Sequence, residues 1–125
     1  MAHILVIDDE AEIRNIVREF LTAGGHTVDT AADGKTGLEL AHTSSYQLVI
    51  TDVIMPGRDG LEVATELRNS HIGIAVLAIT GGGPRIDLEK LGKTAEYMGA
   101  DKVLLKPFTF QQLIETVDEL LNLYR

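Results

Sequence analysis

Short, uninterrupted runs of branched apolar residues alternate along the chain with longer segments in which apolar residues recur every three or four positions. Runs without a polar residue are typical of strands buried on both faces of a parallel sheet. Such runs occupy residues 4–7, 48–50, 74–79 and 103–105. The more polar segment 27–31 suits an edge strand. Because strands and helices alternate, right-handed crossovers are expected to give a single doubly wound α/β fold, a five-stranded parallel sheet with five helices on its two faces.

The predicted helices carry apolar stripes and recognisable end signals. The stripe of the first helix, which ends at Gly24 in a typical C-terminal cap position, consists of Ile13, Ile16, Val17, Phe20 and Leu21. The last helix begins with a capping box at 109–112, and Phe108 before it can pack against Leu113. The weakest helix is expected within 81–99, where Gly92 interrupts the stripe.

The composition limits the size, compartment and partners of the chain. Its 125 residues, 45% of them apolar, suit one globular domain over residues 1–125. The formal net charge of −8 argues against direct nucleic-acid binding and against docking to an anionic membrane. Cysteine is absent, which excludes disulfides and thiolate chemistry. Since neither a membrane-spanning run nor a signal peptide is recognisable, a soluble, cytoplasmic domain is expected.

Reactive polar side chains follow four of the five predicted strands. The acidic residues 8–10 follow the first strand, Asp52 follows the third, Thr80 the fourth and Lys106 the fifth. In open α/β sheets, ligands bind outside the carboxyl ends of the strands. We therefore expect the carboxylates of Asp8, Asp9 and Asp52 to converge with a hydroxyl and an ammonium group at one edge of the sheet.

The expected cluster has a surplus of negative charge. Two unit charges about 4 Å apart repel by roughly 4 kcal/mol at an effective dielectric near 20, so Asp8, Asp9 and Asp52 should either share protons or recruit a cation. Because all the ligand atoms are hard oxygens, Mg²⁺ fits best, and Mn²⁺ is possible. Lys106 and the Thr80 hydroxyl can then contact the oxygens of a phosphoryl group. A carboxylate in these surroundings is suited to accept a phosphoryl group.

The ordered motifs give the whole chain a resemblance to the receiver domain of two-component response regulators. The residues that carry it are Asp8-Asp9-Glu10, the segment 52–60 (Asp-Val-Ile-Met-Pro-Gly-Arg-Asp-Gly), Thr80, and Lys106-Pro107-Phe108. The resemblance implies strand order 2-1-3-4-5. It also implies that a histidine kinase phosphorylates Asp52.

The same resemblance implies a role for each site residue. The Mg²⁺ ligands would be Asp9, Asp52 and the Ile54 backbone carbonyl, with Asp8 acting through water. Thr80 would be the switch hydroxyl and Lys106 the phosphate-sensing ammonium. We expect the bond between Lys106 and Pro107 to be cis, in a tight turn.

The implied partners are those of a signalling domain and not of an enzyme with a free substrate. The phosphoryl donor would be a sensor histidine kinase, a phosphotransfer protein or a small acyl phosphate. The product on Asp52 would hydrolyse with help from the same metal. The output partner is unknown, and a monomer and a weak phosphorylation-dependent dimer are both open. No output region is recognisable after the last helix, which leaves open a stand-alone protein or one domain of a longer regulator.

Each motif also has a simpler interpretation. Asp9 with Glu12 could cap the first helix, Asp52 could be a turn residue at a strand end, and Thr80 could cap a helix or form a turn. Lys106 could be a solvated charge, and Pro107 could end a strand. The simpler interpretations would require five coincidences at one edge. A flavin module is disfavoured because Asp8 and Asp9 would repel a phosphate. An aspartate-based phosphatase would need alternating aspartates and a cap domain. A receiver-like docking module that is never phosphorylated remains the main alternative.

The sequence departs from the receiver pattern at two places. Receivers commonly carry an aromatic residue three positions before the site lysine, and this chain has Val103 there. A β-branched valine has no ring to relocate, so the usual coupling between Thr80 and an aromatic residue is in doubt. The stretch after Thr80 is longer than expected and contains Gly81-Gly82-Gly83-Pro84. We therefore hypothesise that phosphorylation changes the segment 81–99; hydrogen exchange that is unchanged there would contradict this.

Overall fold

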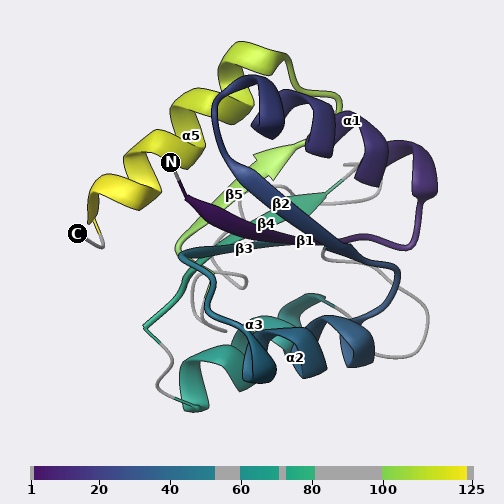
Figure 1. Cartoon of the computed structure of the whole chain (residues 1–125), viewed down its shortest axis with the longest axis vertical. Coiled ribbons are helices and arrows are strands. Elements are labelled where there is room, and N and C mark those ends of the chain that lie inside the picture. The colour runs from purple at the N-terminus through teal and green to yellow at the C-terminus, as the bar shows by residue number, and fades with distance from the viewer. Residues whose placement is uncertain (1, 53–59, 71–72, 81–99, 124–125) are drawn as a thin grey trace.

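The chain forms a five-stranded parallel sheet between two layers of helices (Figure 1). The computed structural model describes residues 2–52, 60–70, 73–80 and 100–123. Its strands are β1 (His3–Ile7), β2 (Thr27–Ala31), β3 (Leu48–Asp52), β4 (Ala75–Thr80) and β5 (Lys102–Leu105). Its helices are α1 (Ala11–Ala23), α2 (Gly34–Thr43), α3 (Gly60–Asn69) and α5 (Phe110–Leu123). The helix expected within 81–99 lies outside the described residues.

The strand order is β2-β1-β3-β4-β5, and every neighbouring pair is parallel. This confirms the predicted doubly wound fold, including its strand order and the edge position of β2. The register aligns the last residues of the strands, since Ile7 pairs with Thr51, Asp52 with Ile79, and Thr80 with Leu105. The carboxyl ends of four strands therefore meet at one edge of the sheet.

Successive strand residues point into two separate cores, as the period of a β-strand requires. On β1, Leu5 and Ile7 pack with residues of α2 and α3, whereas Ile4 and Val6 pack with residues of α1 and α5. Figure 1 shows these two helix pairs on opposite faces of the sheet. Both faces are covered, which explains why the central strands contain almost no polar residues.

The helix ends follow the predicted signals at Gly24 and at 109–112 and depart from them at the start of α1. Asp33 accepts a hydrogen bond from the Thr36 amide, so the segment 34–36 is a capped helix start. Thr109 and Gln112 form the predicted reciprocal capping box of α5. Gly24 occupies the C-cap of α1. Helix α1, however, begins after Glu10 without a side-chain cap, so the interpretation of Asp9 as a cap is wrong.

The packing of α1 and α2 against the sheet shows two details that the apolar stripes do not reveal. A Cβ atom on Gly37 would lie 2.3 Å from the Ile7 side chain, so α2 approaches β1 as closely as only glycine allows. Ile16 belongs to the apolar stripe of α1 but is 41% exposed, whereas Val17 and Leu21 of the same stripe are buried. Within the described ranges, no helix is both long and apolar enough to cross a membrane.

Candidate functional site

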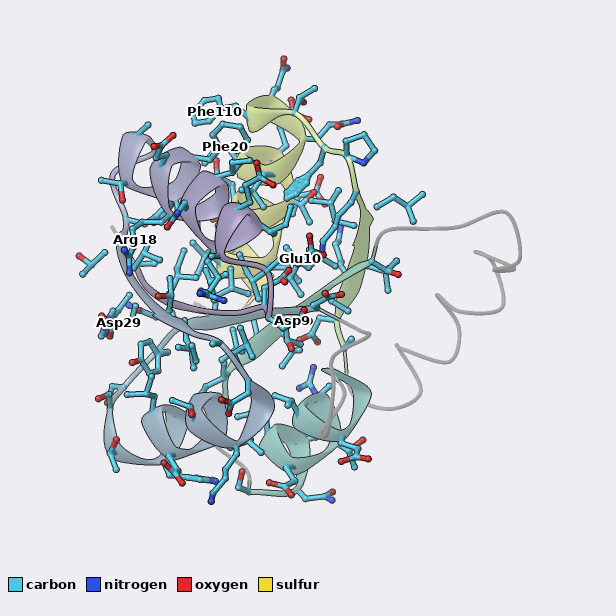
Figure 2. The ribbon with its side chains drawn as sticks, turned by 90° about the vertical axis from the view of Figure 1, so that its right-hand side faces the viewer. Asp9, Glu10, Arg18, Phe20, Asp29 and Phe110 are labelled. Atoms are coloured by element: carbon cyan, nitrogen blue, oxygen red, sulfur yellow. The ribbon has the colours of Figure 1, made fainter. Side chains whose placement is uncertain are left out.

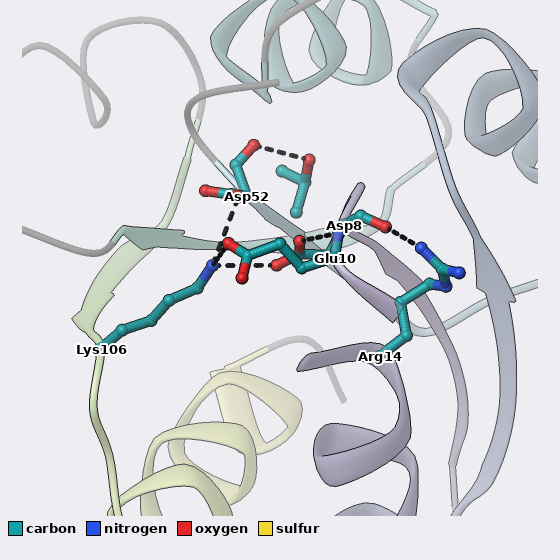
Figure 3. A network of polar contacts seen from close by, with 6 residues as sticks. Asp8, Glu10, Arg14, Asp52 and Lys106 are labelled. Carbon is teal, nitrogen blue, oxygen red and sulfur yellow. Dashed lines mark hydrogen bonds and ion pairs between the residues drawn. The ribbon is translucent and has the colours of Figure 1, made fainter. Parts of the chain in front are cut away.

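The carboxyl edge of the sheet brings together side chains that are far apart in the sequence. Asp8 follows β1, Asp52 ends β3, Thr80 ends β4 and Lys106 follows β5. Lys106 is 54 positions from Asp52 and 98 from Asp8, yet its side chain contacts both (Figure 3). The parallel register described above is what places them at one edge.

The Lys106 ammonium group lies between two buried carboxylates. Its Nζ donates to Asp8 Oδ2 at 3.0 Å and to Asp52 Oδ2 at 3.3 Å. Asp8 is fully buried and Asp52 is 5% exposed, so water cannot replace the ammonium group as their counter-charge. Glu10 Oε1 lies 3.7 Å from the same nitrogen atom, at a much more exposed position. One ammonium group therefore faces three carboxylates.

The pKa values in this group reflect its burial and its surplus of acid. Burial raises the pKa of the Asp8 carboxyl, although the Glu10 amide and the Lys106 ammonium group work in the opposite direction. Burial alone would lower the pKa of Lys106, but the hydrogen bond to Asp8 and the charges of Asp52 and Asp8 outweigh it and raise that pKa. The lysine is thus held in its charged form, and a proton is held more tightly on Asp8 than on a free aspartate.

The acidic residues at this edge could hold a metal ion. Asp8, Asp9, Glu10 and Asp52 each offer one carboxylate oxygen, and the four oxygens lie within 4.8 Å of one another. Asp9 and Glu10 are exposed on the turn between β1 and α1 (Figure 2). An all-oxygen donor set with both buried and exposed members fits a hard divalent cation that retains waters. The Ile54 carbonyl, which the resemblance implies as a further ligand, lies outside the described residues.

The Thr80 hydroxyl occupies the same edge without a bonding partner. Thr80 is 1% exposed, and its Oγ1 atom has no hydrogen-bond partner among the residues that the structure describes. A buried hydroxyl that is left unpaired costs free energy, so such an atom calls for an explanation. A ligand oxygen reaching this edge would give Thr80 an acceptor.

The turn after β5 fixes the start of the lysine side chain. The peptide bond between Lys106 and Pro107 is cis, and the Lys106 amide donates to the Thr80 carbonyl at 2.7 Å. Val103 lies within β5, opposite Ala78, and packs against the core on the α2 and α3 face. The position at which receivers commonly carry an aromatic residue thus holds a half-buried aliphatic side chain.

The structure adds a contact of Arg14 that sequence reasoning missed. Arg14 Nη1 donates to the Asp8 backbone carbonyl at 2.7 Å (Figure 3). The available signal was the direction of helix side chains, which lean toward the N-terminus. A long cationic side chain in the first turn of a helix can therefore reach back to the acidic turn before it. The ion pair between Glu10 and Lys106 was missed as well, because Glu10 was counted in the acidic edge without an assigned partner.

Comparisons with known proteins identify relatives over almost the whole chain. Residues 4–118 match the family model described as response regulator receiver domain. The Transcriptional activator protein IrlR of Burkholderia pseudomallei (strain 1026b) is 39% identical over 119 residues, which cover 95% of this chain and 50% of IrlR. The Transcriptional regulatory protein CusR of Escherichia coli (strain K12) is 35% identical over the same length and 51% covered. The chain therefore spans about half the length of these curated relatives.

Solved structures show the same likeness. The receiver domain of the Francisella response regulator 1452 aligns with a TM-score of 0.90 and 27% identity, and each chain is covered completely. The response regulator protein TrrA of Thermotoga maritima, solved in complex with Mg(2+)-BeF, aligns with a TM-score of 0.82 and 37% identity. That alignment covers 96% of this chain and 99% of TrrA.

Proposed function

The chain belongs to the family of response regulator receiver domains of two-component systems, and from this premise we propose that Asp52 is its phosphoacceptor. The phosphoryl donor is a phosphohistidine of a sensor kinase or phosphotransfer protein, or a small acyl phosphate. Phosphorylation then changes the surface that a downstream partner binds. The proposed unit is the whole chain, residues 1–125, acting as one domain in the cytoplasm.

The observation that carries the proposal is the position of the Lys106 ammonium group between Asp8 and Asp52. When an Asp52 oxygen attacks the phosphorus atom, a P–O bond forms and the P–N bond to the donor histidine breaks. Lys106 can then turn from the carboxylates toward a phosphoryl oxygen and stabilise the negative charge there. The Thr80 hydroxyl can donate its hydrogen bond to another of these oxygens, which would satisfy the buried Oγ1 atom.

We assign the acidic edge to Mg²⁺, with Mn²⁺ as a possible substitute. Asp9, Asp52 and the Ile54 carbonyl would hold the ion directly, and Asp8 would act through water. When bound, the ion supplies charge neutralisation for the incoming phosphoryl group. The buried Asp8, fixed by Lys106 and the Glu10 amide, keeps the turn in place for this role. TrrA, solved in complex with Mg(2+)-BeF, supports the assignment by analogy.

The proposal extends to the loss of the phosphoryl group and to the partners. Water would attack the phosphorus atom of the mixed anhydride on Asp52, which regenerates the carboxylate and releases inorganic phosphate. The domain would therefore promote its own phosphorylation and dephosphorylation without a free substrate to turn over. IrlR and CusR are named as transcriptional proteins. A longer chain that contains this domain would, by analogy, regulate transcription. The domain itself is a poor nucleic-acid binder because its net charge is −8.

The test is the intact mass of the protein after incubation with acetyl phosphate and Mg²⁺. The wild type should gain one phosphoryl group, and Asp52→Ala should gain none. Omission of Mg²⁺, with a chelator present, should abolish the adduct on the wild type. If the wild type gains nothing, a docking module that is never phosphorylated becomes the better description. An adduct that survives in Asp52→Ala would move the acceptor to another residue.

A further inference from the structure

The contact between Arg14 and the acidic turn suggests a further role at this site. Arg14 Nη1 donates to the backbone carbonyl of Asp8 at 2.7 Å. This carbonyl and the amide of Asp9 belong to one planar peptide unit, so holding the oxygen atom fixes the orientation of the whole plane. The plane in turn sets the direction in which the Asp9 side chain leaves the backbone.

Other hydrogen bonds hold the Asp8 side chain, but they do not set the orientation of the peptide plane between Asp8 and Asp9. The Asp8 side chain is already held, because its Oδ1 accepts from the Glu10 amide at 2.8 Å and its Oδ2 accepts from Lys106. Asp9 and Glu10 lie between the end of β1 at Ile7 and the start of α1 at Ala11. Neither strand pairing nor helix hydrogen bonding therefore determines where the exposed Asp9 carboxylate points.

The helix dipole does not explain an arginine at this position. Arg14 lies close to the N-terminus of α1, where the helix dipole favours acidic side chains and disfavours cations. A residue that goes against a local preference is most often retained for a contact elsewhere. The described contact of Arg14 beyond its own helix is with the turn that carries the acidic residues.

We infer that Arg14 is a positioning residue for the cation site: it orients the peptide between Asp8 and Asp9 so that the Asp9 carboxylate faces the ion. This inference rests on the proposed function, since it assumes that Asp9 binds Mg²⁺. The inference predicts that removal of Arg14 changes the Mg²⁺ affinity in the direction opposite to that expected from charge alone. Simple electrostatics predicts that removing a positive charge near a cation site strengthens Mg²⁺ binding, whereas loss of positioning weakens it.

Helix α1 offers a matched control in Arg18, one turn further on. Arg18 Nη2 donates to Thr30 Oγ1 at 3.0 Å, so it also ties α1 to a neighbouring segment. Figure 2 shows Arg18 on the same side of the molecule as Asp29, away from Asp9 and Glu10. Arg18→Met removes the same charge from the same helix without touching the acidic turn.

The experiment is calorimetric titration of Mg²⁺ into the unphosphorylated full chain. Arg14→Met should bind Mg²⁺ about tenfold more weakly than the wild type, the size expected when a group that orients a metal ligand is lost. Arg18→Met should keep the wild-type affinity or bind slightly more tightly. Arg14→Lys, which retains a charged donor, should recover part of the loss. Thermal melts in chelator verify that each variant is folded. If Arg14→Met does not fold, the comparison is made between the wild type and Arg14→Lys.

A kinetic readout separates positioning from general damage to the fold. Phosphorylation of Arg14→Met by acetyl phosphate should be slow at low Mg²⁺ and approach the wild-type rate at saturating Mg²⁺. Equal or tighter Mg²⁺ binding by Arg14→Met overturns the positioning role and leaves only an effect of charge. A wild type that binds no Mg²⁺ overturns the proposed function together with this inference. A wild type that is phosphorylated normally beside an unaffected Arg14→Met overturns this inference alone.

Discussion

The molecule contains two hydrogen-bonded groups built around an aspartate, and they differ in how far their polar side chains are paired within the group. At the carboxyl edge, Asp8 is fully buried, shares Lys106 with Asp52, and lies beside two further carboxylates. Thr80 adds a buried hydroxyl without a partner in the described part of the chain. The carboxyl edge thus combines a surplus of negative charge with a hydroxyl that can still donate a hydrogen bond.

The second group lies near the amino ends of β1 and β3, and its polar side chains hydrogen-bond to one another. Asp29 Oδ2 lies 2.8 Å from His3 Nε2 and accepts from the Tyr46 hydroxyl at 2.8 Å. The rings of His3 and Tyr46 pack with their centroids 4.4 Å apart. Burial and the bond to Asp29 raise the pKa of Tyr46 to about 12, so this phenol remains a donor.

The opposite pKa shifts of the two aspartates express this difference. Burial dominates for Asp8 and raises its pKa, whereas the Tyr46 hydroxyl and the nearby His3 lower the pKa of Asp29. A group that satisfies its own hydrogen bonds contributes to the fold. A group with excess carboxylates, and with a buried hydroxyl that no described residue pairs, is less stable alone and gains from a ligand that supplies the missing charge. That contrast separates a structural cluster from a binding site.

The largest expected difference between the two groups is in phosphoryl transfer. Asp52→Asn and Asp29→Asn make the same chemical change, but the amide at position 52 cannot attack phosphorus. Asp52→Asn should lose all phosphoryl incorporation from acetyl phosphate and Mg²⁺, while Asp29→Asn should keep the wild-type level, as measured by intact mass. Loss in both variants would show that the second group also shapes the acceptor site.

The next largest difference is in the role of lysine. Lys106→Met leaves the buried Asp8 and Asp52 without their shared ammonium group and should destabilise the fold at neutral pH by about 3 kcal/mol. Lys102→Met removes a lysine of β5 whose ion pair with Glu119 is exposed. That loss should remain below about 1 kcal/mol. Urea unfolding of both variants measures the two values, and similar values would mean that the carboxylates at the edge do not depend on Lys106.

A smaller effect is expected from Mg²⁺ on thermal stability. The ion binds only the folded cluster, so it should raise the melting temperature of the wild type. Asp52→Asn relieves part of the repulsion among the carboxylates and should melt a few degrees higher than the wild type in chelator. It should also gain less from Mg²⁺. Asp29→Asn should gain as much from Mg²⁺ as the wild type. The reverse order for Asp52→Asn would place the acidic cluster elsewhere.

Much of the carboxyl edge could be predicted from the sequence because one topological rule fixes it. Once buried runs identify parallel strands, the residues after each strand must meet at one edge, which places Asp8, Asp52, Thr80 and Lys106 without knowledge of side-chain conformations. The strand order came from a family resemblance and not from residue patterns. Residues 53–59 and 81–99, which include Ile54 and the proposed switching segment, lie outside the described residues, so those expectations remain predictions.

The contacts that could not be predicted depend on side-chain reach. His3 and Asp29 meet only because β1 and β2 pair in one register, in which His3 lies opposite Thr27. Helix side chains lean toward the N-terminus, which brings Arg14 within reach of the acidic turn, but its rotamer decides that it contacts Asp8, and the sequence does not encode that rotamer. The exposure of Ile16 could not be predicted either. The wide apolar stripe of α1 indicates which face of the helix is apolar, but packing decides which residues of the stripe are buried.

The smallest effect expected is on the pH dependence of stability, and its sign differs between the two groups. The pKa of Asp29 is lowered in the folded state from 3.8, so its contribution is fully present above that pH and is lost as the pH falls through the folded value. The pKa of Asp8 is raised, so the folded state loses stability as the pH rises from 3.8 through the folded value. Asp29→Asn should therefore flatten the stability curve below pH 3.8, and Asp8→Asn should flatten it above.

Urea unfolding in chelator at closely spaced pH values resolves the two windows. The Asp29 side chain is 47% exposed, so solvent screening should keep its effect below about 1 kcal/mol. The fully buried Asp8 should show the larger change. Added Mg²⁺ sharpens the contrast, because a bound cation favours the ionised carboxylates at the site and should remove much of the loss above pH 3.8. The window below 3.8 should not respond to Mg²⁺, since Asp29 lies outside the acidic group that would hold the ion. A common response of both windows to the ion would mean that the two aspartates belong to one electrostatic unit.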